Sequence, residues 1–310
     1  MLIYVLSRNK ELYSTRRLVE EAKNKGWEVK VIDYLRCTIE IMKGELVINY
    51  QGKVLPTPDA IIPRIGASRT FYGTAMVRHF EMMEVFSTSG NLAIARSRDK
   101  LRSLQVLSRN SVDMPRTVFA SNKSNAKDVI ELSGGAPLVL KILEGTQGVG
   151  VVLVDSEKAA KSVLDAFYGM DVNLLVQEYI EEAGGADIRA FVVNNEVVGA
   201  MKRQGAEGDF RSNLHQGGSA VAYKLNRKEK ATAIAAAKAM GLGVCGVDMI
   251  PSKRGPLVME VNSSPGLEGI EKSTNINIAE RIMEFIEKSV KLSCPSNPQK
   301  RRIKKDNIGA

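Results

Sequence analysis

Cysteines, aromatic residues and long apolar runs are all scarce in this sequence, and each shortage excludes a class of protein. The three cysteines, Cys37, Cys245 and Cys294, are scattered over 310 residues without the spacing of a metal or redox motif. We therefore expect reduced thiols in a cytoplasmic protein. No apolar run is long enough to span a membrane, and the N-terminus lacks the features of a signal peptide.

Aromatic residues make up only 5% of the chain, and no aromatic RNA-binding motif is present, which argues against a nucleic-acid-binding fold. The formal net charge is nevertheless +9. Part of it lies in residues 293–310, which hold five Lys or Arg against one acid. This tail has little apolar content and is predicted to be disordered. It could contact RNA, but a solubilising role explains its charge equally well.

The first ninety residues alternate between short apolar segments and amphipathic ones. This alternation predicts a small parallel α/β domain over residues 1–89. No G-x-G-x-x-G motif follows the first strand, so dinucleotide binding is not predicted. The expected strands are 2–6, 27–33 and 59–66, with helices at 11–25 and 70–86 and a small hairpin around Gln51–Gly52.

From residue 90 onward the predicted strands are mostly joined as hairpins, with helices between them, which is an α+β pattern. One long basic helix is expected over residues 91–110. We divide this part into subdomains at 90–175 and 176–292, followed by the tail at 293–310. The other expected helices are 122–132, 156–167, 227–240 and 276–291.

A metal site is predicted where GVCGVDMI and LVMEVN form a hairpin. Strand alternation places Val258, Glu260 and Asn262 on one side, and Asp248 should lie opposite or diagonal to Glu260, roughly 5–8 Å away. Carboxylate and amide oxygens without His or Cys suit Mg²⁺. Each acid alone could simply face solvent, but the three together favour a metal.

A phosphate site is predicted around Lys141 and the loop from Gly145 to Gly150. Lys141 lies in an apolar strand and needs a partner, unless the strand is at an edge and the side chain reaches solvent. The loop offers backbone N–H groups that can surround phosphate oxygens. It is not a Walker A loop, because a strand follows it and no Lys-Ser/Thr pair ends it.

These segments together resemble the ATP-grasp ligases, and within them the RimK group, which adds glutamate to the C-terminus of a small-subunit ribosomal protein. The resemblance covers residues 1 to about 290 and includes PRIG and FYGTA in the first domain. It rests on the ordered series DKLRS, PLVLKILEGTQGVGVVLV, VQEYI, DIR, DFRSNLHQGG, GVDMI and MEVNSSPGLEGIE. Nothing carries over to the tail.

The resemblance implies a full set of site residues on an ATP-grasp fold. Lys141 and Arg211 would be catalytic. The metal ligands would be Asp248, Glu260 and Asn262, holding two ions of Mg²⁺ or Mn²⁺. The nucleotide-binding residues, which contact phosphate, adenine or ribose, would be Lys100, Lys141, Gly145, Gly148, Gly150, Glu178, Tyr179, Ile180, Asp187, Arg211, Ser212 and Asn213.

The activity implied is ATP-dependent ligation of L-glutamate to a protein C-terminus, a ribosomal protein being the expected acceptor and a homo-oligomer a possible assembly. Two alternatives are open. One is a ligase that joins small amino acids or extends a glutamate chain on a cofactor or carrier. The other is an ATP-binding regulator without catalysis, which ATP hydrolysis dependent on an added amino acid would exclude.

Overall fold

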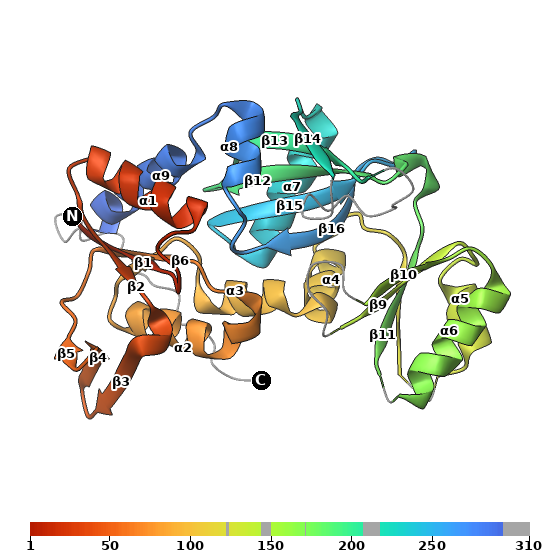
Figure 1. Ribbon diagram of the computed structural model, residues 1–310, viewed down its shortest axis with the longest axis horizontal. Helices are drawn as coiled ribbons and strands as arrows, with labels where there is room; N and C mark the ends of the chain where they lie inside the picture. Colours follow the sequence, from red (N-terminus) through yellow and green to blue (C-terminus); the bar gives the residue numbers. More distant parts are fainter. Residues whose placement is uncertain (122–123, 144–149, 171, 207–217, 294–310) are drawn as a thin grey trace.

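The computed structural model describes residues 1–121, 124–143, 150–170, 172–206 and 218–293. It contains an N-terminal parallel sheet, a central lobe and a five-stranded antiparallel sheet (Figure 1). This mixture of sheets and helices confirms the predicted α+β class with a small N-terminal parallel sheet. In the described part of the chain, no helix combines the length and the apolar character needed to cross a bilayer.

The N-terminal sheet has the strand order β2-β1-β6-β7, and all its pairs are parallel. Helix α1 buries Leu18 and Ala22 and ends before Gly26, whose φ of +73° favours glycine. Because β1 and β6 are parallel neighbours, their carboxyl ends lie at the same edge. The elements are β1 (Leu2–Leu6), α1 (Tyr13–Asn24), β2 (Glu28–Ile32), β6 (Ala60–Pro63), α2 (Thr70–Met82) and β7 (Phe86–Ser87).

A separate three-stranded antiparallel sheet is inserted between β2 and β6. The sequence predicted only its second and third strands, because the first follows a short 3₁₀ turn and is largely exposed at its end. The strands are β3 (Cys37–Met42), β4 (Glu45–Tyr50) and β5 (Lys53–Val54).

The central lobe is an antiparallel sheet of order β10-β9-β11-β8 with two helices packed on it (Figure 1). The lobe has a separate hydrophobic core, which includes Leu140, Leu164 and Val176. Strand β9 lies between β10 and β11 and is therefore not an edge strand. The elements are β8 (Thr117–Ala120), α5 (Ala126–Leu132), β9 (Leu138–Ile142), β10 (Val151–Val154), α6 (Glu157–Gly169) and β11 (Leu174–Glu178).

The third sheet has the order β14-β13-β12-β15-β16 and is covered on both faces. Ala190 and Val192 share a core with α7, whereas the alternate residues Phe191 and Val193 share one with α8 and α9. The elements are β12 (Ala186–Val193), β13 (Glu196–Gln204), β14 (Ser219–Ala222), α7 (Arg227–Met240), β15 (Val244–Ile250), β16 (Leu257–Asn262), α8 (Glu268–Thr274) and α9 (Ile278–Ser293).

The long helix predicted over residues 91–110 is wrong, because the structure has two helices there. Helix α3 (Asn91–Arg98) ends at Asp99, and α4 (Lys100–Arg109) begins directly after it. Asp99 is extended, with ψ at 106°, and its side chain accepts a hydrogen bond from the N–H of Arg102. This is the geometry of an N-cap, so the acid starts a second helix instead of continuing the first.

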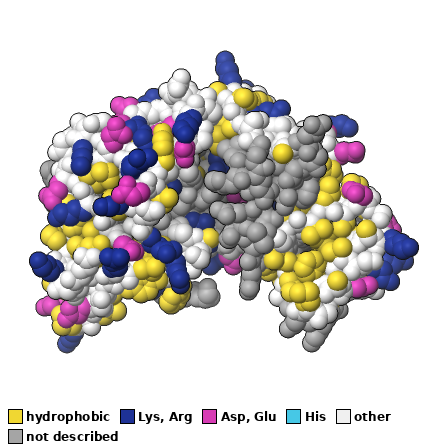
Figure 2. All heavy atoms as spheres, in the orientation of Figure 1, with side chains coloured by type: hydrophobic (Ala, Val, Ile, Leu, Met, Phe, Trp, Pro, Cys, Tyr) yellow, Lys and Arg dark blue, Asp and Glu magenta, His cyan; other side chains and the backbone are white. Residues whose placement is uncertain are grey.

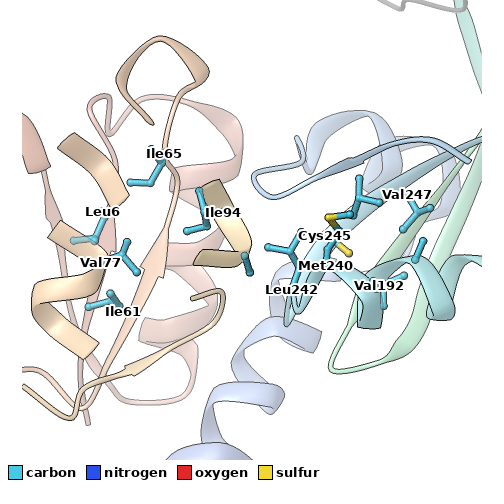
Figure 3. Packing of buried hydrophobic residues seen from close by; sticks show 14 of the residues in the cluster. Leu6, Ile61, Ile65, Val77, Ile94, Val192, Met240, Leu242, Cys245 and Val247 are labelled. Carbon is cyan, nitrogen blue, oxygen red and sulfur yellow. The ribbon is translucent and has the colours of Figure 1, made fainter. Parts of the chain in front are cut away.

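Two hydrophobic cores join the N-terminal unit to the five-stranded sheet. In one of them, Leu6, Ile65 and Ile94 lie on one side and Met240 and Val247 on the other (Figure 3). The second core joins β1 to α9. The central lobe therefore stands apart, while β1 packs against α9. The domain boundaries at 89, 175 and 292 stay a prediction.

Charged side chains are dispersed on the face in Figure 2, where Lys and Arg alternate with acids over the N-terminal unit. Hydrophobic side chains gather on the central lobe in the same view, and Phe119, Leu132 and Met170 are exposed large hydrophobic residues there. Cys37 and Cys245 are free, which agrees with the expectation of reduced thiols, and both are buried, whereas Cys294 lies outside the described residues.

Gly243 tests the junction between the N-terminal unit and the five-stranded sheet. A Cβ at this position would lie 2.3 Å from the carbonyl oxygen of Thr88 and 2.9 Å from the ring of Phe285. Gly243→Ala should therefore lower the free energy of unfolding by roughly 1–3 kcal/mol, because the backbone at Thr88 has to move. Denaturant unfolding of the purified protein measures this.

The matched control is Gly169→Ala at the end of α6, where an added Cβ meets nothing within 4 Å. Equal stability of the two variants would show that the junction is looser than described.

Candidate active site

The predicted metal hairpin forms between β15 and β16, and its register places Asp248 directly opposite Glu260. Asn262 is two residues further along and pairs with Gly246. Its side-chain oxygen accepts a hydrogen bond from the N–H of Ser264 at 2.9 Å, which fixes the amide. Two carboxylates and one amide oxygen therefore lie at neighbouring positions on this hairpin.

The predicted position of Val258 on the face of Glu260 is wrong. The register shifts between Asp248 and Met249, so that Val258 pairs with Met249. Val258 is fully buried in the same core as Val261. The extra residue in β16 makes a bulge, which turns the strand and separates the apolar half of the hairpin from the polar half.

Two arginines hold the acids in place across three adjacent strands. Arg189 on β12 donates from Nε and Nη2 to both oxygens of Asp248, at 2.7 and 2.6 Å. Arg203 on β13 donates from Nη2 to the same carboxylate at 2.8 Å. Arg203 also forms a two-pronged ion pair with Asp187, with its Nε at 2.6 Å from Oδ1. Such forked, charge-assisted pairs fix the orientation of each group.

Asp187 is 2% exposed and is engaged by Arg203. Its observed role is to orient Arg203, and a contact with the ribose stays a prediction. Asp187 and Arg189 lie two residues apart in β12 and therefore share a face, whereas Arg203 was not among the predicted site residues.

The two facing acids have opposite electrostatic environments. Burial alone would raise the pKa of Asp248, but Arg189 and Arg203 outweigh it and hold that pKa well below its usual range. Glu260 is 59% exposed, yet desolvation by the surrounding protein, together with the charge of Asp248, raises the pKa of its carboxyl group. Arg189 reaches it only at 4.0 Å. The negative charge of Glu260 is therefore not compensated by a close cationic side chain, and a bound cation would stabilise it.

The cluster sets three carboxylates (Asp187, Asp248 and Glu260) against two guanidinium groups, which leaves it with an excess of acidic groups. Within the described ranges, no group of three His, Cys, Asp or Glu side chains is arranged to hold a metal. A metal here would therefore depend on the amide oxygen of Asn262 as a ligand, and the assignment of all three ligands stays a prediction.

Lys141 lies within the central lobe's sheet and not at its edge, so the alternative of an edge lysine reaching solvent is excluded. Its Nζ donates to the side-chain oxygen of Gln177 at 2.6 Å. Burial lowers the pKa of Lys141 to about 8, with Glu260 opposing this effect and Lys100 adding to it. A neutral amide is its only side-chain acceptor among the described residues, so the ammonium group lacks a counter-ion.

Lys100 begins α4 and lies near the end of β9. Its Nζ donates to the carbonyl oxygens of Ile142 and Leu143, at 3.0 and 3.1 Å. Burial lowers its pKa, and Glu260 partly offsets the effect. Lys100, Lys141 and Glu260 thus influence one another's charge, which brings the predicted phosphate and metal residues into one region.

The predicted adenine linker, Glu178 to Ile180, leaves the end of β11. The N–H of Glu178 donates to Arg116 O and that of Tyr179 to Pro137 O, whereas that of Ile180 donates to no described residue. The carboxylate of Glu178 accepts from the N–H of Arg116 and forms an ion pair with Arg254. An open N–H beside an anchored side chain is compatible with an adenine acceptor.

Part of the predicted site lies outside the described residues, namely Gly145, Gly148, Arg211, Ser212 and Asn213. Gly150 is described and has a φ of +74°. A Cβ there would lie 2.2 Å from the side chain of Ile142, so only glycine fits where the loop returns to β10.

Comparison with known proteins covers almost the whole described chain. Residues 1–94 match the family described as RimK PreATP-grasp domain, and residues 97–286 match the RimK-like ATP-grasp domain. A protein named "Probable alpha-L-glutamate ligase" from Saccharophagus degradans is 60% identical over 301 residues, which is 97% of this chain and 99% of that protein.

Two solved structures show the same fold at low sequence identity. The ATP-grasp ligase PsnB complexed with minimal precursor, Mg and ADP gives a TM-score of 0.71 at 17% identity, covering 94% of this chain and 98% of PsnB. The D-alanine–D-alanine ligase of Bacillus anthracis complexed with ATP gives 0.68 at 18%, covering 94% and 98%.

The low pKa of Lys141 predicts a specific pH dependence of stability. Its folded pKa of about 8 lies below the ordinary lysine value of 10.5, so between these pH values the unfolded chain binds a proton that the folded chain has released. The free energy of unfolding of the wild type, relative to Lys141→Met, should therefore rise as the pH increases from about 8 to about 10.5. Denaturant unfolding at several pH values measures the difference.

Lys158→Met, at an exposed position on α6, is the control for loss of a lysine charge. A difference between wild type and Lys141→Met that stays constant over this pH range would contradict the desolvated state of Lys141.

Proposed function

Because the chain belongs to the RimK family of ATP-grasp ligases and is an ATP-dependent ligase, we propose that it joins L-glutamate to a carboxylate of a peptide or protein. The observation that carries this proposal is the identity of 60% to a named alpha-L-glutamate ligase over nearly the full length of both chains. The solved PsnB structure contains a precursor, which supports a peptide acceptor on this fold.

The proposed reaction has two steps and needs no covalent enzyme intermediate. A carboxylate oxygen of the acceptor attacks the γ-phosphorus of ATP, and the bond to the bridging oxygen breaks to release ADP. The amine of glutamate then attacks the acyl carbon of the acyl phosphate. An amide bond forms, inorganic phosphate leaves, and the nitrogen loses a proton.

The chain's contribution is charge and alignment. Lys100 and Lys141 supply positive charge beside the site of the phosphates, where Lys141 lacks an anionic partner among the described residues. Arg211 is proposed to act with Lys141 on the transferring phosphoryl group. Loops at residues 145–150 and 211–213 are proposed to exclude water, which would otherwise hydrolyse the acyl phosphate.

Asp248, Glu260 and Asn262 are proposed to hold two ions of Mg²⁺ or Mn²⁺. The PsnB structure contains Mg with ADP, which supports Mg²⁺. Such ions, when bound, neutralise the negative charge of the phosphate oxygens. Arg189 and Arg203 keep Asp248 ionised and fixed, so the chain needs no rearrangement of that carboxylate to accept a cation.

The proposed acceptor is the C-terminus of a small-subunit ribosomal protein, modified in the cytoplasm by a homo-oligomeric enzyme. The basic residues between Lys300 and Lys305, which lie outside the described part, would then contact RNA. The test is to incubate the enzyme with ATP, Mg²⁺, isotope-labelled glutamate and candidate acceptors, and to follow the mass of each acceptor. Addition of glutamate to a C-terminus supports the proposal, whereas products formed only from free amino acids would overturn the protein acceptor.

Glu260→Gln tests the metal assignment. The substitution keeps the shape and removes the charge, so kcat should fall about a hundredfold or more, since several kcal/mol of transition-state stabilisation depend on the metal. The fold should persist, because the variant also removes the like charge facing Asp248. Activity and thermal unfolding are measured together, with Glu131→Gln on the exposed face of α5 as the control.

Normal turnover by a folded Glu260→Gln enzyme would exclude Glu260 as a metal ligand. A raised Mg²⁺ requirement in that variant would identify metal binding as the function that is lost.

A further inference from the structure

Two arginines, Arg64 and Arg98, differ from Arg189 and Arg203 because they have no acidic partner among the described residues. Arg64 directly follows β6, and Arg98 is the last residue of α3. Neither forms an ion pair with a carboxylate of any described residue, whereas Arg189 and Arg203 are both forked onto acids. Guanidinium groups that are partly buried without a counter-ion are costly, so their retention calls for an anionic partner.

Backbone contacts place the two arginines together at the carboxyl edge of the N-terminal sheet. Nη2 of Arg98 donates to the carbonyl oxygen of Ile65 at 2.6 Å, next to Arg64 in the chain. The N–H of Arg64 donates to Leu6 O at 3.0 Å, which ties it to the end of β1. Ligands of parallel sheets bind outside the carboxyl ends of the strands, which is where both residues lie.

Arg98 also carries an unsatisfied donor. Its Nε is buried and has no hydrogen-bond partner among the described residues. The same holds for the hydroxyl groups of Ser263 and Ser264, in the segment that continues β16. Buried donors are normally satisfied, so these groups indicate a polar ligand in this region.

The electrostatics agree with this geometry. Burial lowers the pKa of Arg64 to about 10, and the like charge of Arg98 adds to the effect. Burial also lowers the pKa of Arg98, which Glu260 partly offsets. The two guanidinium groups therefore repel each other, and Arg98 lies close enough to the metal hairpin to be influenced by the charge of Glu260.

We propose that Arg64 and Arg98 together bind a carboxylate of an acid substrate, and so set the enzyme's preference for an acidic amino acid or an acidic acceptor. This inference rests on the proposed ligase function and names the residues that select its substrate. The phosphates of ATP are a less suitable partner, because their proposed ligands (Lys100, Lys141, Arg211 and the loop at 145–150) all follow residue 99 in the chain, whereas Arg64 belongs to the N-terminal unit. A bidentate guanidinium matches the planar geometry of a carboxylate.

The test is the kinetic behaviour of Arg64→Met, whose side chain makes no hydrogen bond to any described residue. KM should rise about tenfold to a hundredfold for either L-glutamate or the acceptor, because a charge-assisted contact is lost, while KM for ATP stays within about twofold. The substrate whose KM rises is the one that supplies the carboxylate. Arg109→Met, at an exposed position at the end of α4, is the matched control.

Arg98→Lys tests the second arginine without removing its charge, since loss of the whole side chain would also remove the contact with Ile65 O. Lysine keeps the positive charge but cannot form the two parallel hydrogen bonds of a guanidinium group. The KM that rises in Arg64→Met should therefore also rise in Arg98→Lys, by a smaller factor. Unchanged KM values for both acid substrates in Arg64→Met, or a rise confined to ATP, would overturn the inference.

A binding measurement separates this inference from the proposed function. Calorimetric titration of wild type and Arg64→Met, each with ADP and Mg²⁺, uses L-glutamate and the dipeptide acetyl-Glu-Glu as probes. Weaker binding of one probe by the variant supports the carboxylate site even if no acceptor is found for ligation. If the two proteins bind both probes equally, or if wild type binds neither probe, the carboxylate site is contradicted. If the enzyme nevertheless ligates glutamate, the proposed ligase function still stands.

Discussion

The charge row across β13, β12, β15 and β16 is the interaction on which the rest of the site depends. Arg203 and Arg189 alternate with Asp187 and Asp248 on neighbouring strands, and each arginine donates to carboxylate oxygens from both Nε and Nη2. Removing any one member would leave a buried charge without its partner, which is strongly destabilising. The row therefore holds Asp248 ionised, and it ends at Glu260, the only one of its acids with no guanidinium closer than 4.0 Å among the described residues.

Two single-residue bulges produce this row, and this is why the sequence predicted only part of it. The two-residue turn at Asn194–Asn195 pairs Val193 with Glu196, so regular counting would place Lys202 opposite Asp187. The register shifts between Phe191 and Val192, and Arg203 takes that position instead. In the second hairpin, Ile250 pairs with Leu257, so regular counting would place Met259 opposite Asp248, but the bulge places Glu260 there instead. The pattern of apolar residues predicts where the strands lie, whereas the position of a bulge depends on tertiary packing and cannot be predicted from a single sequence.

Elements with strong local signals were predictable, and those set by contacts were not. The bounds of α7 agree with the expected 227–240, because its capping box and the following Gly241 are both visible in the sequence. The break between α3 and α4 depends on one aspartate, and the short β7, β14 and α8 owe their form to neighbouring elements. The acids and Lys141 could be named from the sequence, whereas Arg203, which pairs with two of those acids, could not.

The distribution of unpaired charge links the site to its substrates. The acids of the sheet are largely neutralised by arginines, but Lys141, Arg64 and Arg98 have no carboxylate partner among the described residues. Burial lowers the pKa of each of them, so the folded chain holds these cations at a cost in free energy. An anionic ligand that reaches them recovers this cost as binding energy. Lys141 lies on the central lobe and Arg64 on the N-terminal unit, so a phosphate at the first and a carboxylate at the second would be held by two different parts of the fold. The same uncompensated charges that weaken the free protein would in this way align the two reactants.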